Sequence, residues 1–317
     1  MVVDEEGKPI QNIPVGVGFE RNTGSGVTSV GIDGKTNSNG VFESRGKTTN
    51  YVYYRIDTDG YYSSSGKYKF EKEVAKKWQP WNPEIKVTLR KIEKPVPMYA
   101  RRFDKVLPQK DKDIGCDLIA NDWVEPYGKG THSDIVFHLK KQYLSDDDYA
   151  ADLLVKFAGK NDGHVKYNLD MYSGSEFKLP RYAPVDGYQK QFVRHVVKQL
   201  GKTIKDDRDD SVGYVFRVRS GVNNSYNAMY GKIQRDVEVR AMGEGTAGVA
   251  FTYYLNPDHT RNLEFDSKRN LFTDLGRAEQ VDAMVHDTLR SPLSLSLQIE
   301  RPGRYRKSSP FLNNKGA

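Results

Sequence analysis

Cysteine is almost absent from this chain of 317 residues, which contains only Cys116. A single cysteine excludes an internal disulfide framework. Cys116 has no local signature of a reactive thiol, so we expect it to be a small buried apolar side chain. The scarcity leaves export open, because an exported protein need not contain disulfides.

Long apolar runs are also missing. No stretch approaches the ~18 apolar residues that a transmembrane helix needs, so no membrane span is expected. The first residues, MVVDEEG, already have the pattern of a strand and a turn, and no signal peptide precedes them. Either the native protein starts there or an export signal has been removed.

Blocks of like charge are absent as well. The 49 lysines and arginines give a net charge of +7, but they are interleaved with 42 aspartates and glutamates. Such interleaving favours a well-solvated surface over a dedicated polyanion site. Nucleic acid is therefore an unlikely partner.

Motifs for catalysis or metal binding are missing too. The Gly-Lys-Thr triplets at Gly34, Gly46 and Gly201 lack the glycine that a P-loop requires five positions earlier. There is no Gly-x-Ser-x-Gly elbow and no His-Glu-x-x-His helix. No two of the six histidines have a metal-ligand spacing. We expect no catalytic residue, no metal and no cofactor.

Two acidic runs leave calcium as an alternative. One spans residues 146–148 with Asp152, and the other spans residues 206–210. The second run fails the EF-hand pattern, because Val212 stands where a glycine is required and no glutamate follows at position twelve. A solvated loop is favoured over calcium binding.

Turns and short alternating segments dominate residues 1–92. Val15, Val17 and Phe19 alternate with glycines, and Ile85, Val87 and Leu89 alternate with polar residues. A period of two places one set on a core face and the other in water. This pattern predicts a small antiparallel β-sandwich.

The same segment resembles a known family. The resemblance rests on VDEEGKPI at residues 3–10, Val15, GKT at 34–36, NGVF at 39–42 and GYY at 60–62. In that order these motifs resemble the carboxypeptidase regulatory-like domain. The resemblance implies a transthyretin-like (Ig-like) β-sandwich that serves as an accessory module in exported bacterial proteins. The family provides no catalytic residue.

The prolines at positions 95 and 97 mark the expected domain boundary, because they favour a stiff extended linker. Residues 1–92 and 93–317 are thus predicted to form two domains. Alternating segments predict a large antiparallel β-sandwich for the second; they lie at residues 135–139, 165–171, 214–218, 249–255 and 293–299. The fold class expected is all-β.

One or two short helices are expected within the large domain. Tyr188, Phe192, Val196 and Leu200 lie four residues apart, as do the apolar residues 281, 285 and 289. This spacing matches one face of a helix. Residues 192–197 also suit a strand, so both interpretations stay open for the first segment.

The larger part carries a second resemblance. It rests on three segments: DLIANDWVEPYGKG at residues 117–130, MYGKI at 229–233 and YYLNPDHTRNLE at 253–264. Together they resemble uncharacterised exported bacterial proteins that pair a regulatory-like domain with a longer β region. The resemblance implies a periplasmic, outer-surface or secreted location and implies no activity.

Aromatic and polar clusters provide the candidate ligand-binding residues. Tryptophan and tyrosine rings stack on sugars or pack in cores, and Arg261 offers a forked donor group. The structural interpretation, in which the rings pack in a core and Arg261 pairs with Glu264, is favoured. The candidates are Trp78, Trp81, Trp123, Tyr127, Tyr254, Arg261, Asn262 and Glu264.

We expect an exported cell-envelope binding or structural protein. Its partners would be a polysaccharide, an envelope protein or further copies of the chain. The alternative is a carbohydrate-active enzyme with two carboxylates in the large β domain, where glycoside hydrolysis needs carboxyl groups ~5–9 Å apart. The sequence favours the non-catalytic role. A cleft with two facing acids would favour the enzyme, and an uncovered edge strand would favour the binding protein.

Overall fold

The computed structural model describes residues 1–221 and 227–281. These residues form strands and connecting loops, and none of the described segments is an α-helix. The expected all-β class is confirmed. None of the described residues belongs to a helix with the length and apolar character needed to cross a membrane.

The N-terminal part is built around a five-stranded antiparallel sheet. Its order is β15 (Gly174–Ser175), β5 (Ser64–Lys69), β4 (Tyr51–Ile56), β2 (Pro14–Thr23) and β3 (Gly26–Lys35). Two short pairs accompany it: β1 (Val2–Val3) with β8 (Val87–Thr88), and β6 (Lys72–Val74) with β7 (Lys77–Gln79). The apolar faces of β2, β4 and β8 supply core residues such as Val15, Ile56 and Val87.

Two six-stranded sheets form the larger part. The first has the order β11 (Asp122–Trp123), β10 (Asp113–Asp117), β12 (Ile135–Ser145), β13 (Asp148–Phe157), β16 (Gln191–Lys198) and β17 (Lys205–Asp206). The second has the order β14 (Gly163–Asn168), β18 (Val212–Val218), β19 (Met229–Met242), β20 (Thr246–Asn256), β9 (Val96–Leu107) and β21 (Phe265–Asn270).

One apolar core joins these two sheets into a sandwich. It includes Phe103 of β9, Phe137 of β12 and Phe251 of β20, which come from both sheets. Each belongs to the inward set of an alternating strand, as period-two patterning requires. The sulfhydryl of Cys116 lies in the same core, where burial raises the pKa of the thiol. Cys116 is thus the buried apolar residue expected.

The helix expected over residues 188–200 is wrong, because this segment contains strand β16. Strand β16 pairs with β13 from Lys198 to Gln191. Arg194 and Val196 are buried while Val193 and His195 are exposed, which is period two. Residues four apart share a face in a strand as well as in a helix, so this spacing did not distinguish a strand from a helix. Most of the second expected helix, and the alternating segment 293–299, lie outside the described residues.

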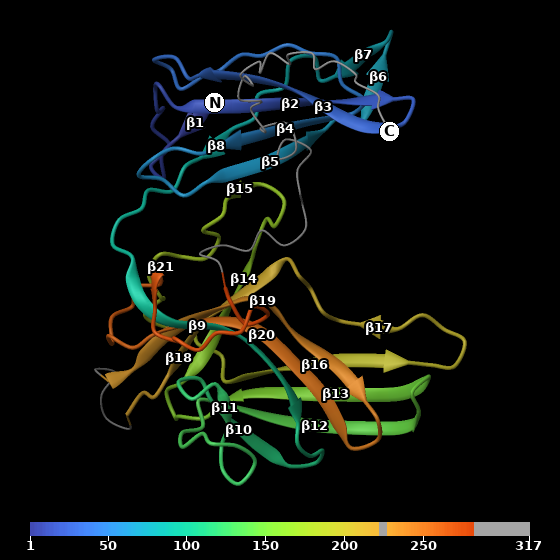
Figure 1. Ribbon diagram of the computed structural model, residues 1–317, viewed down its shortest axis with the longest axis vertical. Coiled ribbons are helices and arrows are strands. Elements are labelled where there is room, and N and C mark those ends of the chain that lie inside the picture. The colour runs from blue at the N-terminus through green and yellow to red at the C-terminus, as the bar shows by residue number, and fades with distance from the viewer. Residues whose placement is uncertain (222–226, 282–317) are drawn as a thin grey trace, which may run out of the picture.

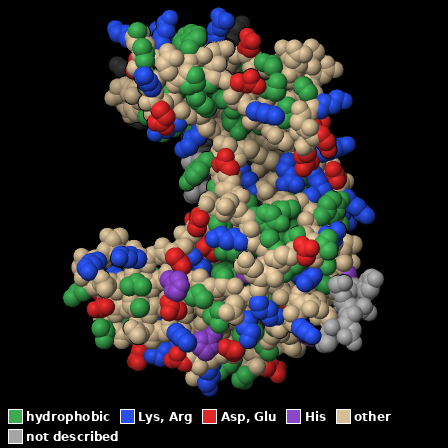
Figure 2. Space-filling view, turned by 180° about the vertical axis from the view of Figure 1, so that it is seen from behind, with side chains coloured by type: hydrophobic (Ala, Val, Ile, Leu, Met, Phe, Trp, Pro, Cys, Tyr) green, Lys and Arg blue, Asp and Glu red, His purple; other side chains and the backbone are tan. Residues whose placement is uncertain are grey.

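The chain passes between the two parts more than once. Residues 92–95 lead into β9, and β15 returns from the larger part to pair with β5 (Figure 1). Figure 2 shows the molecule hollowed on one side, between the N-terminal sheets above and the larger sandwich below. The division into residues 1–92 and 93–317 stays a prediction.

Candidate functional site

Trp123, one of the candidate stacking residues, belongs to the core of the large sandwich. Its ring meets those of Phe103 and Phe137 edge-on, with centroids 5.0 and 5.7 Å apart. Its indole N–H donates to the carbonyl of Val106 at 3.0 Å. The nearby candidate Tyr127 is partly buried against this core. The indole of Trp123 is therefore covered by protein.

Trp78 and Trp81 differ in how much of each ring is exposed. Trp78 is half-buried, stacks on Phe70 at 5.9 Å and donates its indole N–H to Thr48 at 3.0 Å. Trp81 is 69% exposed, and the ammonium group of Lys77 lies 5.2 Å from its ring centroid. Only Trp81 presents most of its ring to solvent.

The remaining candidates lie around the turn after β20, where each has a structural partner. The Tyr254 side chain is fully buried, and its hydroxyl donates to Gln234 at 3.0 Å. The guanidinium of Arg261 donates to the carbonyl of Ala183 at 2.9 Å. Asn262 donates its amide to Lys94 at 2.7 Å.

The expected pairing of Arg261 with Glu264 is wrong, because Glu264 pairs with Arg181 at 2.8 Å. The fully buried carboxylate of Glu264 also accepts hydrogen bonds from the hydroxyl of Tyr62 and from the backbone N–H groups of Glu93 and Lys94. Burial alone would raise the pKa of Glu264, but these donors and Arg181 together lower it below its usual value. The carboxylate of Glu264 therefore has a structural role, because its partners come from distant segments of the chain.

Lys232 completes this junction cluster, which we define as Tyr62, Arg90, Arg181, Lys232 and Glu264. Its ammonium group lies 4.7 Å from the ring centroids of both Phe177 and Tyr254, and it donates to the carbonyl of Leu263 at 3.0 Å. Burial, aided by Arg90 and opposed by Glu264, lowers the pKa of Lys232 to about 7. The cluster joins the two parts of the molecule, and all of its members are buried except Arg90, which is partly exposed.

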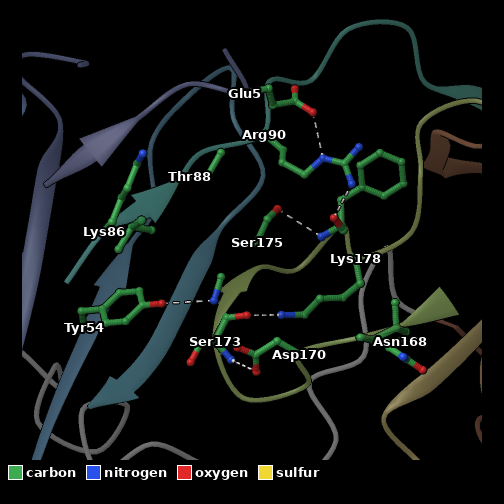
Figure 3. A pocket seen from close by; sticks show the side chains of 14 residues that line it. Glu5, Tyr54, Lys86, Thr88, Arg90, Asn168, Asp170, Ser173, Ser175 and Lys178 are labelled. Carbon is green, nitrogen blue, oxygen red and sulfur yellow. Dashed lines mark hydrogen bonds and ion pairs between the residues drawn. The ribbon is translucent and has the colours of Figure 1, made fainter. Parts of the chain in front are cut away.

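An open groove lies beside this cluster. Its volume of about 540 Å³ falls within the ~300–1,000 Å³ of typical ligand sites. One wall comes from the N-terminal part and the other from the segment that leads through β15 (Figure 3). The walls consist of Glu5, Tyr54, Lys86, Val87, Thr88 and Arg90 on one side, and Asn168, Leu169, Asp170, Ser173, Gly174, Ser175, Phe177 and Lys178 on the other.

Arg90 shapes the floor of this junction groove. Its guanidinium stacks on the ring of Phe177 at 4.1 Å and donates to the carbonyls of Phe177 and Leu179, each at 2.7 Å. It also pairs with Glu5 at 3.0 Å. The wall strands are tied by the hydroxyl of Tyr54, which accepts the N–H of Gly174 at 3.1 Å. These bonds leave the groove preformed.

Both carboxylates of the groove are engaged. Glu5 pairs with Arg90 and with Arg181, at 3.0 and 2.8 Å. Asp170 accepts the N–H groups of Tyr172 and Ser173 at 2.9 and 3.0 Å and so closes a turn. A general acid or base needs a carboxyl group aimed at the substrate, and here both stabilise the protein instead.

Four other polar groups face the groove with few or no bonds. Among the described residues, the side chains of Lys86, Thr88 and Asn168 have no partner, and all three residues are exposed (Figure 3). The ammonium group of Lys178 donates to the carbonyl of Ser173 at 2.6 Å. Burial lowers the pKa of Lys178, although Asp170 opposes the shift. The groove thus offers two cationic donors beside a hydroxyl and an amide.

The acidic run at residues 206–210 surrounds a buried arginine. The guanidinium of Arg194 lies 3.0 Å from Asp206, 2.7 Å from Asp207 and 2.9 Å from Asp236. These carboxylates balance the charge of Arg194, which is only 3% exposed. No group of three or more potential ligands within the described residues is arranged to hold a metal ion.

The sequence interpretation missed Lys86, Asn168 and Lys178. The alternation of residues 85–89 correctly placed Lys86 on the polar face of its strand. The residues of the opposite wall, however, lie about ninety positions later in the sequence, as the hydrogen bond from Arg90 to Leu179 shows. The pairing of β15 with β5 and the bonds of Tyr54 and Arg90 bring the two walls together. A two-residue strand leaves no periodic signal from which that pairing could be predicted.

Comparison of the chain with models of protein families, with curated proteins and with solved structures finds no match. The resemblance to the carboxypeptidase regulatory-like domain therefore stays a prediction from its motifs. Function has to be argued from the chemistry of the site, since one fold supports many functions.

Proposed function

We propose that this protein is a non-catalytic binding protein that holds an acidic oligosaccharide in the junction groove. The observation that carries the proposal is the pair of lysines, Lys86 and Lys178, on opposite walls of an open polar groove. Ammonium groups with few protein partners are available for charge-assisted hydrogen bonds to carboxylates.

Acidic sugars fit this lining better than other anions do. A uronic acid presents one carboxylate and several hydroxyls on each ring. Thr88 and Asn168 supply neutral donors and acceptors for hydroxyls, while the lysines supply cations. Nucleic acid would need more phosphate contacts than two lysines provide. The groove is open to solvent, which suits a chain that extends beyond the site.

Binding is favoured over hydrolysis because Glu5 and Asp170 are already engaged. Retaining and inverting glycosidases both need two carboxyl groups free to exchange protons with substrate or to attack it. Glu5 balances two arginines, and Asp170 closes a turn. The location that suits an acidic glycan ligand is the cell envelope, which is also what the resemblance of the N-terminal segment implies.

The test measures binding of a uronic acid oligomer and of a neutral glucan oligomer of equal length by calorimetry. We expect the wild-type protein to bind the acidic oligomer more tightly. Lys86→Ala should weaken that binding about tenfold or more, because a hydrogen bond to a charged group contributes roughly 1.5–3 kcal/mol. Added salt should weaken it further, over a Debye length of ~8–10 Å.

The matched control is Lys47→Ala, which removes the same charge from an exposed lysine of the N-terminal part that does not line the groove. It should bind as the wild type does. The proposal fails if the wild type binds neither oligomer, if both bind equally, or if the two lysine variants lose the same affinity. The last result would mean that net charge alone attracts the ligand.

A further inference from the structure

Strand β3 lies at the edge of the N-terminal sheet. It pairs with β2 over ten residues without a break in register. Within the described part of the chain, no other strand pairs with it. One long side of its backbone therefore has no neighbouring strand among residues 1–221 and 227–281.

The free backbone groups can be assigned from the register. Thr36, the residue after β3, donates its N–H to the carbonyl of Ile13 at 3.0 Å. Bonded and non-bonded positions alternate along an antiparallel pair, so the even-numbered residues of β3 bond to β2. The odd-numbered residues direct N–H and C=O outward; they are Val27, Ser29, Gly31, Asp33 and Lys35.

Strand β3 is the longest edge strand in the described part of the sheets. Strands β11, β15 and β17 have two residues each, β14 has six, and β21 pairs with β9 in a broken register. Natural proteins protect edges with prolines, bulges or charges. Strand β3 has no proline and no bulge, and its charges, Asp33 and Lys35, lie at one end only.

The core-facing side of β3 is also partly uncovered. Val30 lies opposite Phe19, which is 6% exposed and belongs to an apolar cluster. Val30 shares that face and is nevertheless 38% exposed. Ile32, on the same face, packs against the cluster but is only partly buried. One more strand beyond β3 would cover both side chains.

We propose that this strand is supplied by β3 of a second copy of the chain, in an antiparallel pair with a two-fold axis at Gly31. Strand β3 of one copy then pairs with β3 of the other copy. Every outward N–H group of one strand therefore meets an outward carbonyl of the other, as a two-fold interface requires. The pair forms about ten backbone hydrogen bonds and joins the two five-stranded sheets into one.

This register also matches side chains. Val30 of each copy lies opposite Ile32 of the other, at a non-bonded position where side chains approach most closely. Gly31 lies on the axis without a side chain to clash. Val27 of each copy lies opposite Lys35 of the other. Neither the groove nor its ligand takes part, so the two proposals stand or fall separately.

The first experiment measures the mass of the full chain by light scattering after size exclusion. We expect twice the 36.1 kDa of one chain. Ser29→Pro removes an outward N–H and should give the monomer mass, since proline cannot donate to a neighbouring strand. Ser29→Ala retains that N–H and should remain dimeric. A wild-type monomer at all concentrations, including one in which β3 pairs within its own chain, overturns the proposal.

The second experiment tests the register and does not depend on proline being tolerated. Val27 is 59% exposed, so its replacement leaves the monomer intact. Val27→Glu places a carboxylate opposite Lys35 of the second copy at two symmetric points and should tighten the dimer about two- to tenfold. Val27→Lys should weaken it by a similar factor. Equal dissociation constants for the two variants in sedimentation overturn this register and the proposal with it.

Discussion

The three tryptophans share one chemistry and have three environments. Trp81 is 69% exposed, Trp123 is 4% exposed and Trp78 lies between them. A sequence reveals that a ring can stack on a sugar or pack in a core, but it does not reveal which neighbours the fold will supply. For Trp123 those neighbours are aromatic rings from β9 and β12, distant in sequence. The role of the residue therefore depended on the fold.

This difference predicts separate effects on stability. Trp123→Ala should lower the free energy of unfolding by about 3–5 kcal/mol, because it leaves a cavity in the core. Trp81→Ala should change it by less than about 0.5 kcal/mol, as at other exposed positions. Chemical denaturation of both variants against the wild type measures the two values. Similar losses would mean that Trp81 also packs against protein or that Trp123 does not.

Glu176, just after β15, predicts a pH dependence. Burial raises its pKa to about 7, aided by the carboxylate of Asp57 and opposed by the N–H of Ser63, which it accepts at 2.8 Å. A carboxyl group with a raised pKa stabilises the fold below its ordinary pKa of 4.5, and this contribution is lost as pH rises through about 7.

Glu176→Gln keeps the hydrogen-bond acceptor and removes the charge. Its melting temperature should therefore rise relative to that of the wild type between pH 5 and pH 8. Glu43→Gln, at an exposed glutamate, serves as the control and should show a constant difference from the wild type. Thermal melts across this range make the comparison. A constant difference for Glu176→Gln as well would contradict the assignment.

At the scale of elements, alternation predicted the strands because most of them have one buried face. Ile135, Phe137 and Leu139 alternate along β12 and are buried, whereas Val136 and His138 between them are partly exposed. Residues 192–197 were open to both a helix and a strand, because a spacing of four residues fits both periods, and the strand is what forms. Strand pairing was beyond prediction wherever a strand is very short, as β15 is. For this reason the fold class was predictable, and the groove was not.

At the scale of the whole molecule, the junction cluster decides how the two parts are held. The sequence singled out Glu264 as a ligand-binding candidate because it lies in an unusual polar turn. Its partners come from the loop between β4 and β5, from the segment 92–95 and from residue 181, and no local pattern connects them. A buried carboxylate is retained only where several donors balance it. The unusual turn was thus a signal for structure.

The junction makes a prediction about the linker. In Glu264→Gln the side chain presents an amide to a donor such as the N–H of Lys94, and Arg181 loses the buried carboxylate among its charged partners. Removal of one partner from a buried pair costs about 3–5 kcal/mol. The N–H of Glu93 also loses its charged acceptor. A glutamate-specific protease should therefore cut after Glu93 sooner than in the wild type, giving fragments 1–93 and 94–317.

Glu279→Gln provides the control, because Glu279 pairs with Arg101 at 2.6 Å but its side chain is 35% exposed. Partly exposed pairs contribute about 0–1 kcal/mol, so this variant should unfold close to the wild type and resist cleavage at Glu93 equally. Denaturation and timed proteolysis are measured on all three proteins. If Glu264→Gln matched Glu279→Gln in both, the buried carboxylate would not be what fastens the linker, and the two parts would be held by the pairing of β15 with β5 instead.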